Sequence, residues 1–365
     1  MREYKIDDKS YLDKLSQRQV FPLHIHWDGS IPAEAVFARA QHLGIDLKLP
    51  DVDFHGRPVR YGSAEEQVIH DPQSLKSFMT DLRSYRIGDV FGTVIGLMRD
   101  PKGLAWAADA HCRYLKGQNI PYSETRFAPQ YHASDGFSIE DVMRCSIDSF
   151  HEAKLIHDVD VRLIICLGRE SDVRFTSRIV DDVIRCNRDH PDMVLGIDLA
   201  CEENGNPPQK HLKAFKKTLG TPLKRTVHAG EMCDEDTNLF NIFTALYILR
   251  PDAISQAIPI HRDPMLVEEM ARRNIRLESN PISNHVFFNH DIEDLHLDSL
   301  LEQGVPVTIS PDDPAMIPDG DLHHNLYHLG KLYGDGFVKQ VIRNSIECSW
   351  GLSEEDKKRY LKDIE

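Results

Sequence analysis

The stretch Phe21-Pro-Leu-His-Ile-His-Trp-Asp28 combines a short apolar run with two histidines one residue apart. A run of this length is typical of a buried strand, and side chains two apart on a strand point to the same face. His24 and His26 can therefore reach one metal ion. Two partly exposed strand residues would give the same pattern, so a metal-site prediction depends on what the rest of the chain supplies.

Similar apolar runs recur along the chain, and helix-like stretches separate them. The predicted strands are residues 21–26, 120–127, 161–167, 194–200, 225–228, 253–258, 275–278 and 305–309, and the clearest predicted helices are residues 142–154, 177–188, 239–249 and 264–273. Eight buried strands alternating with helices predict an α/β fold, a TIM-like parallel (β/α)8 barrel. An open doubly wound sheet would give a similar pattern, but no Gly-x-Gly-x-x-Gly follows an early strand.

The first and second predicted strands are unusually far apart. Roughly ninety residues separate them, far more than a βα unit needs. We interpret residues 32–43 and 72–97 as mainly helical. With residues 47–70 they would form a helical cap inserted after the first strand, spanning roughly residues 31–118, over the barrel mouth. The chain has no repeats or Gly/Ser linkers, so a single domain over residues 1–365 is predicted.

Composition narrows the range of partners and compartments. The 365 residues include 58 acidic and 43 basic side chains, a formal charge of -15 that repels nucleic acid and anionic membranes. No apolar stretch approaches a membrane span, and the charged first residues do not resemble a secretory signal. Seven scattered cysteines without a CxxC motif indicate reduced thiols, so a cytoplasmic location is predicted. The oligomeric state stays open.

A second chemical signal is Arg225-Thr-Val-His-Ala-Gly-Glu231. His228 ends a short strand, and the Ala-Gly pair after it permits a tight turn. Glu231 can then return toward a metal without binding it, and a carboxylic acid in that place can move protons. The alternative is a core histidine followed by a helix-capping glutamate.

The third signal is Val307-Thr-Ile-Ser-Pro-Asp-Asp-Pro314. Asp312 and Asp313 follow an apolar strand, so one can bind metal while the other accepts a hydrogen bond from a substrate. A turn with an N-cap ahead of Pro314 is the alternative.

Together these segments predict one hydrolytic metal centre. Three imidazoles and one carboxylate, with a position left for water, describe a catalytic zinc site. The ligands would be His24, His26, His228 and Asp312. Zinc lowers the pKa of a bound water from about 15.7 to about 7.

With these motifs in place, the chain resembles the adenosine deaminase branch of the metal-dependent amidohydrolases. The likeness covers most of the chain. It rests on Leu23-His-Ile-His-Trp-Asp-Gly-Ser30, Glu124-Thr-Arg-Phe-Ala-Pro129, Gly196-Ile-Asp-Leu-Ala200, His228-Ala-Gly-Glu231, Ser279-Asn-Pro-Ile-Ser-Asn284 and Ser310-Pro-Asp-Asp-Pro-Ala315. The resemblance implies one Zn²⁺ per chain and hydrolysis of a 6-aminopurine nucleoside, with adenosine and water giving inosine and ammonia.

The resemblance also implies roles for individual residues. Glu231 would protonate the purine ring as water attacks the carbon that bears the amine. Asp313 would hold the neighbouring imidazole nitrogen, and the backbone N–H of Cys201 would meet the remaining ring nitrogen. Asp28 would accept a hydrogen bond from the ribose 5′-hydroxyl. A carboxylate near that position repels phosphate, so nucleotides are less expected. Arg126, at the end of the second strand, is predicted to brace the barrel.

Two positions depart from the family pattern. Gln256 stands where relatives carry a strand-six histidine; an amide can donate a hydrogen bond but cannot carry a proton at neutral pH. Losing such a partner would slow turnover about 10²–10³-fold. His261 would compensate only if its loop were rebuilt. Cys201 replaces the usual glycine and either narrows the pocket floor or merely fills space.

These departures leave two alternatives to adenosine deamination. Gln256 and Cys201 can mark an enzyme for a different aminopurine or a modified nucleoside. A catalytically impaired nucleoside-binding relative is the other alternative. The intact set of metal ligands together with Glu231 argues against it.

Overall fold

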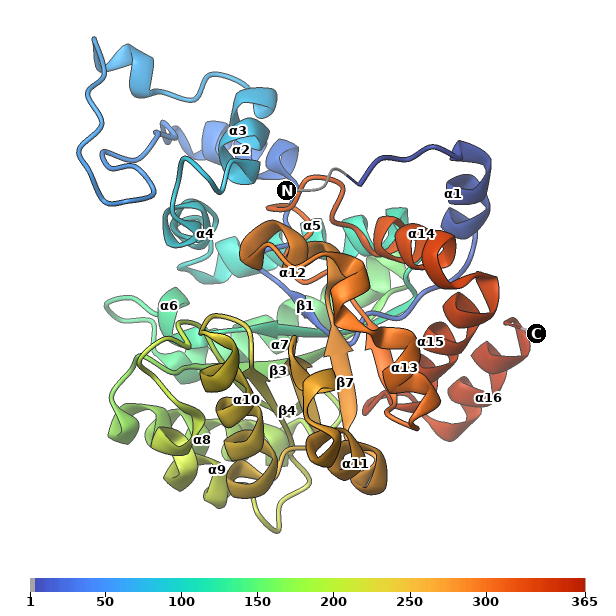
Figure 1. Ribbon diagram of the computed structural model, residues 1–365. Helices are drawn as coiled ribbons and strands as arrows, with labels where there is room; N and C mark the ends of the chain where they lie inside the picture. Colours follow the sequence, from blue (N-terminus) through green and yellow to red (C-terminus); the bar gives the residue numbers. More distant parts are fainter. Residues whose placement is uncertain (1–3, 365) are drawn as a thin grey trace.

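The computed structural model describes residues 4–364 and contains one eight-stranded sheet in which each strand pairs in parallel with the next (Figure 1). The strands are β1 (Ile25–His26), β2 (Tyr122–Phe127), β3 (Asp160–Gly168), β4 (Val194–Ala200), β5 (Lys224–Ala229), β6 (Ala253–Gln256), β7 (Arg276–Ser279) and β8 (Val307–Ile309). Helices surround the sheet. The predicted α/β barrel is therefore confirmed.

The barrel closes between β1 and the residues that follow β8. Ile25 and Asp312 form a parallel bridge. The N–H of His26 donates to the carbonyl of Asp312 at 3.0 Å, and the N–H of Asp312 donates to the carbonyl of His24 at 3.3 Å. Closure brings the first and last strands together at their carboxyl ends, where the catalytic sites of such barrels lie.

The α-helices alternate with the strands and cover the outside of the barrel. They are α1 (Lys9–Ser16), α2 (Ala33–Leu43), α3 (Pro72–Thr80), α4 (Ile87–Ile95), α5 (Pro101–Gly117), α6 (Pro129–His132), α7 (Ile139–His157), α8 (Val173–Asp189), α9 (Leu212–Lys217), α10 (Glu235–Thr244), α11 (Pro264–Arg273), α12 (Pro281–Phe288), α13 (Leu297–Glu302), α14 (Leu322–Tyr333), α15 (Asp335–Glu347) and α16 (Glu354–Lys362). A π-helical turn, η3 (Ala245–Leu249), continues α10.

Local sequence explains where several helices begin. Asp71, Asp100 and Asp263 precede prolines, and each aspartate accepts a hydrogen bond from a backbone N–H in the first turn of the helix that follows. An aspartate N-cap accepts a backbone N–H that has no partner within the helix. Proline at the first helical position fixes φ near the helical value. Among residues 4–364, no helix has both the length and the apolar character that a membrane span requires.

The segment between β1 and β2 carries α2, α3 and α4, which lie beside the barrel at the upper left of Figure 1. The predicted helix over residues 72–97 is interrupted, because a turn that starts at Asp81 separates α3 from α4. Phe78 is buried here and packs against Tyr85, with ring centroids 4.9 Å apart. Helix α5 packs against α7 in the ring around the barrel.

Candidate metal centre and catalytic site

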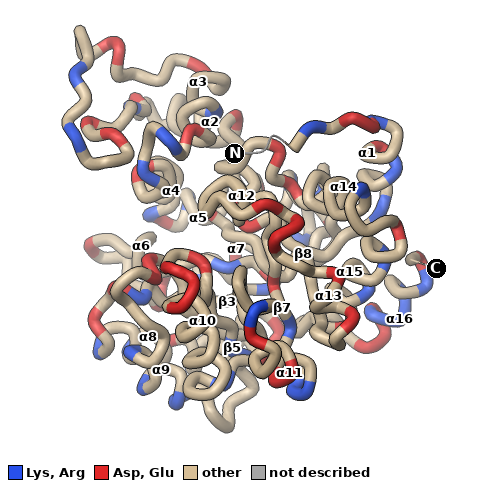
Figure 2. Tube along the Cα trace, in the orientation of Figure 1, with Lys and Arg blue, Asp and Glu red and all other residues tan. Residues whose placement is uncertain are grey.

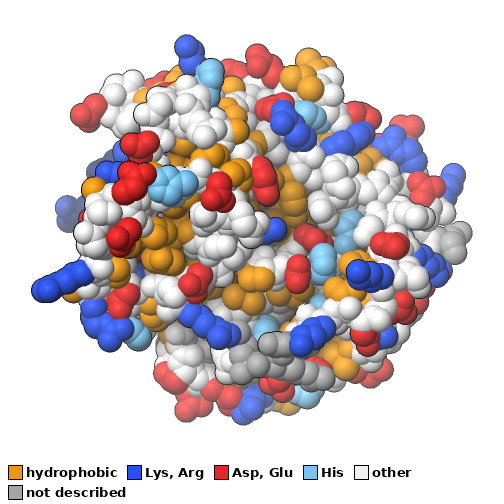
Figure 3. Space-filling model, turned by 90° about the horizontal axis from the view of Figure 1, so that it is seen from above, with side chains coloured by type: hydrophobic (Ala, Val, Ile, Leu, Met, Phe, Trp, Pro, Cys, Tyr) orange, Lys and Arg blue, Asp and Glu red, His pale blue; other side chains and the backbone are white. Residues whose placement is uncertain are grey.

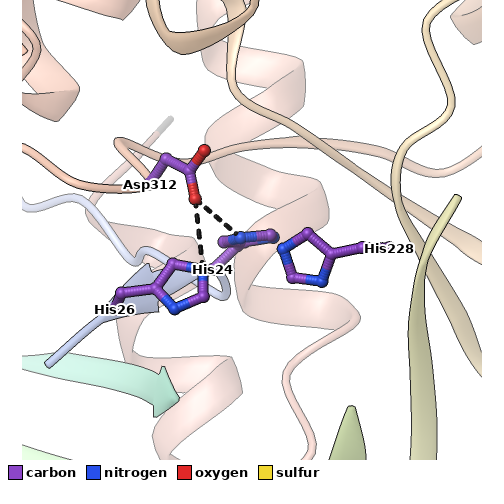
Figure 4. Close-up of side chains that lie close together, drawn as sticks. All are labelled: His24, His26, His228 and Asp312. Atoms are coloured by element: carbon purple, nitrogen blue, oxygen red, sulfur yellow. Dashed lines mark ion pairs between the residues drawn. The ribbon is translucent and has the colours of Figure 1, made fainter. Parts of the chain in front are cut away.

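Four side chains converge at the carboxyl ends of the strands (Figure 4). His24 and His26 come from the first strand region, His228 from β5, and Asp312 from the residues after β8. One ligand atom from each lies within 4.8 Å of the others. Nε2 of His24 is 2.9 Å and Nε2 of His26 is 3.3 Å from Oδ1 of Asp312. The structure thus brings together all four residues that the sequence predicts as ligands.

Two buried carboxylates lie behind the histidines. Oδ2 of Asp198, on β4, is 2.9 Å from Nδ1 of His228. Oε2 of Glu278, on β7, is 3.3 Å from Nδ1 of His24. A carboxylate at Nδ1 fixes the tautomer and directs Nε2 toward a metal. Burial also lowers the pKa of His228 to about 4, so this ring is neutral, as a ligand must be.

Arg126 connects these two carboxylates. Its Nη1 is 2.9 Å from Asp198, and its Nη2 is 2.8 Å from Glu278. All three side chains are fully buried. Burial opposes ionisation of Glu278, but the charges of Arg126 and Arg276 outweigh it and lower the pKa of its carboxyl. Arg126 therefore ties β2 to β4 and β7 through charged contacts behind the metal ligands.

The second oxygen of Asp312 is held by two donors. Gln256 Nε2 donates to Oδ2 at 3.0 Å, and Ser283 Oγ donates to the same atom at 2.7 Å. Gln256 Oε1 is buried and accepts no hydrogen bond from residues 4–364. Gln256 thus contacts a predicted metal ligand directly. His261 lies outside the four-residue cluster, with its ring centroid 4.3 Å from that of His296.

Four non-glycine residues at or just after the carboxyl ends of strands have a left-handed backbone. The φ angles are +75° at Cys201, +69° at Gln256, +46° at Ala257 and +63° at Asp312. Such conformations cost about 1 kcal/mol or more and persist where the surrounding structure enforces them, often at functional sites. The positive φ at Cys201 gives a physical reason for the glycine that the family pattern leads us to expect there.

Glu231 lies on a loop that Glu203 holds in place. The carboxylate of Glu203 accepts the backbone N–H of Gly230 at 2.9 Å, of Glu231 at 3.0 Å and of Met232 at 3.2 Å. Burial raises the pKa of Glu231 well above its ordinary value, and the nearby Glu203 and Asp312 add to the shift. Burial therefore favours the protonated form of the Glu231 carboxyl.

Asp28 and Asp313 lie near each other, and Asp313 is also close to Asp312 and His24 of the cluster. Asp313 is buried, and burial together with Asp312 and Asp28 raises the pKa of its carboxyl. A Cβ at Gly29 would lie 1.7 Å from Asp313 Oδ1, so only glycine fits there. Oδ2 of Asp28 is 3.4 Å from Nε2 of His132, a fully buried residue on α6 that the sequence did not single out.

Cys201 lies beside a small apolar floor. The buried Ala128, Cys166 and Ala200, at the ends of β2, β3 and β4, form a cluster that Cys201 packs against. The hydroxyl of Tyr131 lies 3.7 Å from Cys201 Sγ. Burial raises the pKa of the Cys201 thiol to about 12, so it stays protonated. Viewed toward the carboxyl ends, hydrophobic side chains gather near the middle of this face, with charged ones around them (Figure 3).

Comparisons with known proteins found relatives that cover most of the chain. The family model described as adenosine deaminase matches residues 21–365. A protein of Albidiferax ferrireducens named adenine deaminase is 27% identical over 90% of this chain and 88% of its own. One of Wolinella succinogenes with the same name is 28% identical over 94% and 95%.

Solved structures show the same fold. An adenine deaminase of Arthrobacter aurescens superposes with a TM-score of 0.77 at 23% identity, covering 95% of this chain and 98% of that one. An amidohydrolase of Burkholderia ambifaria with bound zinc gives a TM-score of 0.77 at 18% identity, covering 100% and 95%.

Proposed function

Because the chain belongs to the adenosine deaminase family, we propose that it hydrolyses the exocyclic amine of a 6-aminopurine at a single zinc ion. The observation that carries this proposal is the convergence of His24, His26, His228 and Asp312 near Glu231, a buried carboxyl whose pKa is raised by burial and by the charges of Glu203 and Asp312. Neither a structural zinc site nor a simple binding pocket needs a protonated carboxylic acid beside the ligands.

The donor set fits zinc. Three imidazole nitrogens and one carboxylate oxygen would hold the ion, and Asp198 and Glu278 already orient two of the rings. When bound, the metal supplies a water whose pKa is lowered to about 7. The closed all-cysteine pattern of structural zinc sites is absent from this cluster.

The protein's own groups would supply the protons. Attack of water on a ring carbon removes aromatic delocalisation, which is favourable only if a ring nitrogen is protonated at the same time. Glu231 would donate that proton, since burial raises the pKa of its carboxyl and so favours the protonated form. Burial and the charges of Asp312 and Asp28 raise the pKa of Asp313, which would let its carboxyl donate to the neighbouring imidazole nitrogen of the purine. The N–H of Cys201 would meet the remaining ring nitrogen.

Adenosine is the nucleoside that Asp28 favours, because its carboxylate can accept the 5′-hydroxyl proton and would repel a phosphate. Free adenine is the second candidate. The relatives named adenine deaminase support it. The 3.4 Å contact between Asp28 and His132 also supports it, since this pair would narrow the place where a ribose would lie.

We further propose that the insertion of roughly residues 31–118 caps the barrel mouth. Its helices α2, α3 and α4 lie at the side of the barrel where the chain leaves β1. The seven free cysteines support a cytoplasmic location.

Two measurements test the function. Elemental analysis of the purified protein should find one zinc per chain. Ultraviolet absorbance should then show conversion of adenine or adenosine, and comparing adenine, adenosine, AMP and N6-methyladenine would identify the preferred substrate. Protein that contains zinc but converts none of the four would contradict deamination of this substrate class.

The variant Glu231→Gln tests whether Glu231 transfers the proton. This variant keeps the shape of the side chain but cannot transfer a proton, so we expect turnover to fall at least about 10²-fold while zinc content stays unchanged. Equal turnover in the variant would mean that Glu231 is not the proton donor.

A further inference from the structure

Helix α10 and its continuation η3 carry an exposed aromatic stripe, which we define as Phe240, Phe243 and Tyr247. These side chains are 56%, 44% and 37% exposed. The ring centroids of Phe243 and Tyr247 are 4.7 Å apart, and those of Phe240 and Phe243 are 6.4 Å apart. Contiguous aromatic surface of this kind marks interaction sites, whereas isolated exposed apolar residues are ordinary.

The stripe is not needed to hold the catalytic loop. The opposite side of α10 is buried and holds the loop that carries Glu231. Asn241 Nδ2 donates to Glu203 Oε1 at 2.9 Å, and Asn238 pairs with the backbone of Cys233. Stability of the folded chain therefore gives no reason for three aromatic rings on the outer side.

The charges at the two ends of the stripe identify its partner. Asp236 lies seven residues before Phe243, and Arg250 lies seven residues after it. Both are exposed, and neither forms an ion pair with residues 4–364. Figure 2 shows the acidic start of α10, where Asp236 follows Asp234 and Glu235. If two copies of the stripe lie antiparallel, the negative end of each copy faces the positive end of the other.

We propose that this stripe is the contact between two copies of the chain, which pair through α10 in antiparallel orientation about a twofold axis near Phe243. Phe243 then meets Phe243 of the second copy, and Phe240 lies against Tyr247 of that copy. Asp236 reaches Arg250 of the second copy at each end. This is an isologous interface, in which the same surface serves both subunits.

The size of the contact sets the strength of the pairing. Residues 236–244 of α10 extend over about 12 Å at 1.5 Å per residue, and the π-helical turn η3 continues the helix to Leu249. One helix pair of that length belongs to the small interface class, so we expect a dimer that dissociates in the micromolar range rather than an obligate one. Sedimentation velocity at about 1 to 100 µM protein should show a monomer–dimer equilibrium.

Two sets of variants test the geometry. Phe243→Glu places two like charges together at the twofold axis, so we expect the dissociation constant to rise at least about 100-fold. Met265→Glu is the control, because Met265 is 72% exposed on α11 and lies outside the stripe. Circular dichroism and melting temperature should show that both variants are folded.

A reciprocal charge exchange tests the register. Asp236→Arg alone and Arg250→Asp alone each bring like charges together, and each should weaken the dimer about tenfold. Combining them restores opposite charges and should restore the dimer. Arg250 has a φ of +53°, a conformation that aspartate tolerates. A wild type that stays monomeric at 100 µM, or a dimer that Phe243→Glu leaves intact, would overturn the proposal.

Discussion

One continuous set of contacts links the metal ligands to a buried arginine. His24 contacts Glu278, Glu278 contacts Arg126, Arg126 contacts Asp198, and Asp198 contacts His228. Each carboxylate thus has a histidine on one side and a guanidinium on the other. A buried carboxylate without such partners would take up a proton and would no longer orient its histidine.

Replacing Arg126 by lysine should damage both stability and metal binding. Lysine is a point charge and cannot contact Asp198 and Glu278 with two parallel donors. One buried carboxylate then lacks its partner, so we expect a loss of about 2–4 kcal/mol in the free energy of unfolding, measured by urea denaturation. Arg359→Lys is the control, since Arg359 is 62% exposed and its pair with Asp356 should matter little. Equal effects of the two substitutions would contradict this account.

Gln256 should act on the metal through Asp312. Gln256→Met preserves the length of the side chain but removes the donor to Asp312 Oδ2, leaving only Ser283 in contact with that oxygen. We expect zinc to dissociate about 10- to 100-fold more readily, measured by competition with a chromogenic chelator. Gln303→Met, at an exposed position after α13, should leave zinc binding unchanged. An unaltered zinc affinity in Gln256→Met would show that this hydrogen bond does not support the ligand.

Individual elements differ in how well the sequence predicts them. The bounds of β4 and α11 agree with the predicted residues 194–200 and 264–273, because β4 is a continuous buried run and Asp263, Pro264 and Asn274 mark the ends of α11. The first strand was predicted over residues 21–26, but only Ile25–His26 is strand. A buried extended segment and a strand have the same hydrophobic pattern, so sequence alone does not separate them.

Within the candidate site, the sequence likewise predicts some residues and misses others. The convergence of His24, His26, His228 and Asp312 could be predicted, because the carboxyl ends of the strands meet at one edge of a barrel and bring distant motifs together. Asp198 and Glu278 were missed, although a lone acid inside an apolar strand is a signal that a partner must be buried beside it. The contacts of Glu203, Ser283 and Gln256 depend on loop and turn geometry that no sequence periodicity encodes.

Docking of α5 on the barrel should depend on pH through His111. Its ring lies between Ser30 Oγ at 2.6 Å and Thr125 Oγ1 at 3.0 Å, and burial lowers its pKa to about 3. An unfolded chain takes up this proton near pH 6.5 and the folded chain does not. The contribution of His111 to stability is therefore complete above pH 6.5 and declines by about 1.4 kcal/mol per pH unit below it.

His111→Gln removes this titration while keeping a side chain that can contact both hydroxyls. Between pH 6.5 and pH 5, the free energy of unfolding should fall less steeply in the variant than in the wild type. We expect the two slopes to differ by about 1.4 kcal/mol per pH unit. Urea denaturation at several pH values measures both slopes. Parallel curves would mean that His111 is protonated in the folded protein.

For the molecule as a whole, the candidate metal centre and the closure of the barrel occupy the same place. β1 has only two residues, and it meets the residues after β8 through the His26–Asp312 and Asp312–His24 backbone bonds. Ser310 Oγ adds two bonds to this seam, because it accepts the backbone N–H groups of Leu23 and His24. The side chains of His24, His26 and Asp312 are predicted metal ligands. A bound ion would therefore reinforce the seam at which the first and last strands meet.

Removing the metal should consequently destabilise the whole barrel. A ligand present at about 1,000 times its dissociation constant stabilises the folded state by about 4 kcal/mol, so we expect chelation to lower the melting temperature by several degrees. Hydrogen exchange should rise first at residues 24–26 and 310–313, because these segments lose the bridge between them. His26→Ala is the informative comparison: it should melt below the wild type and respond little to the chelator. A chelator effect that is equal in both proteins, or exchange that rises evenly around the barrel, would show that the ion does not secure this seam.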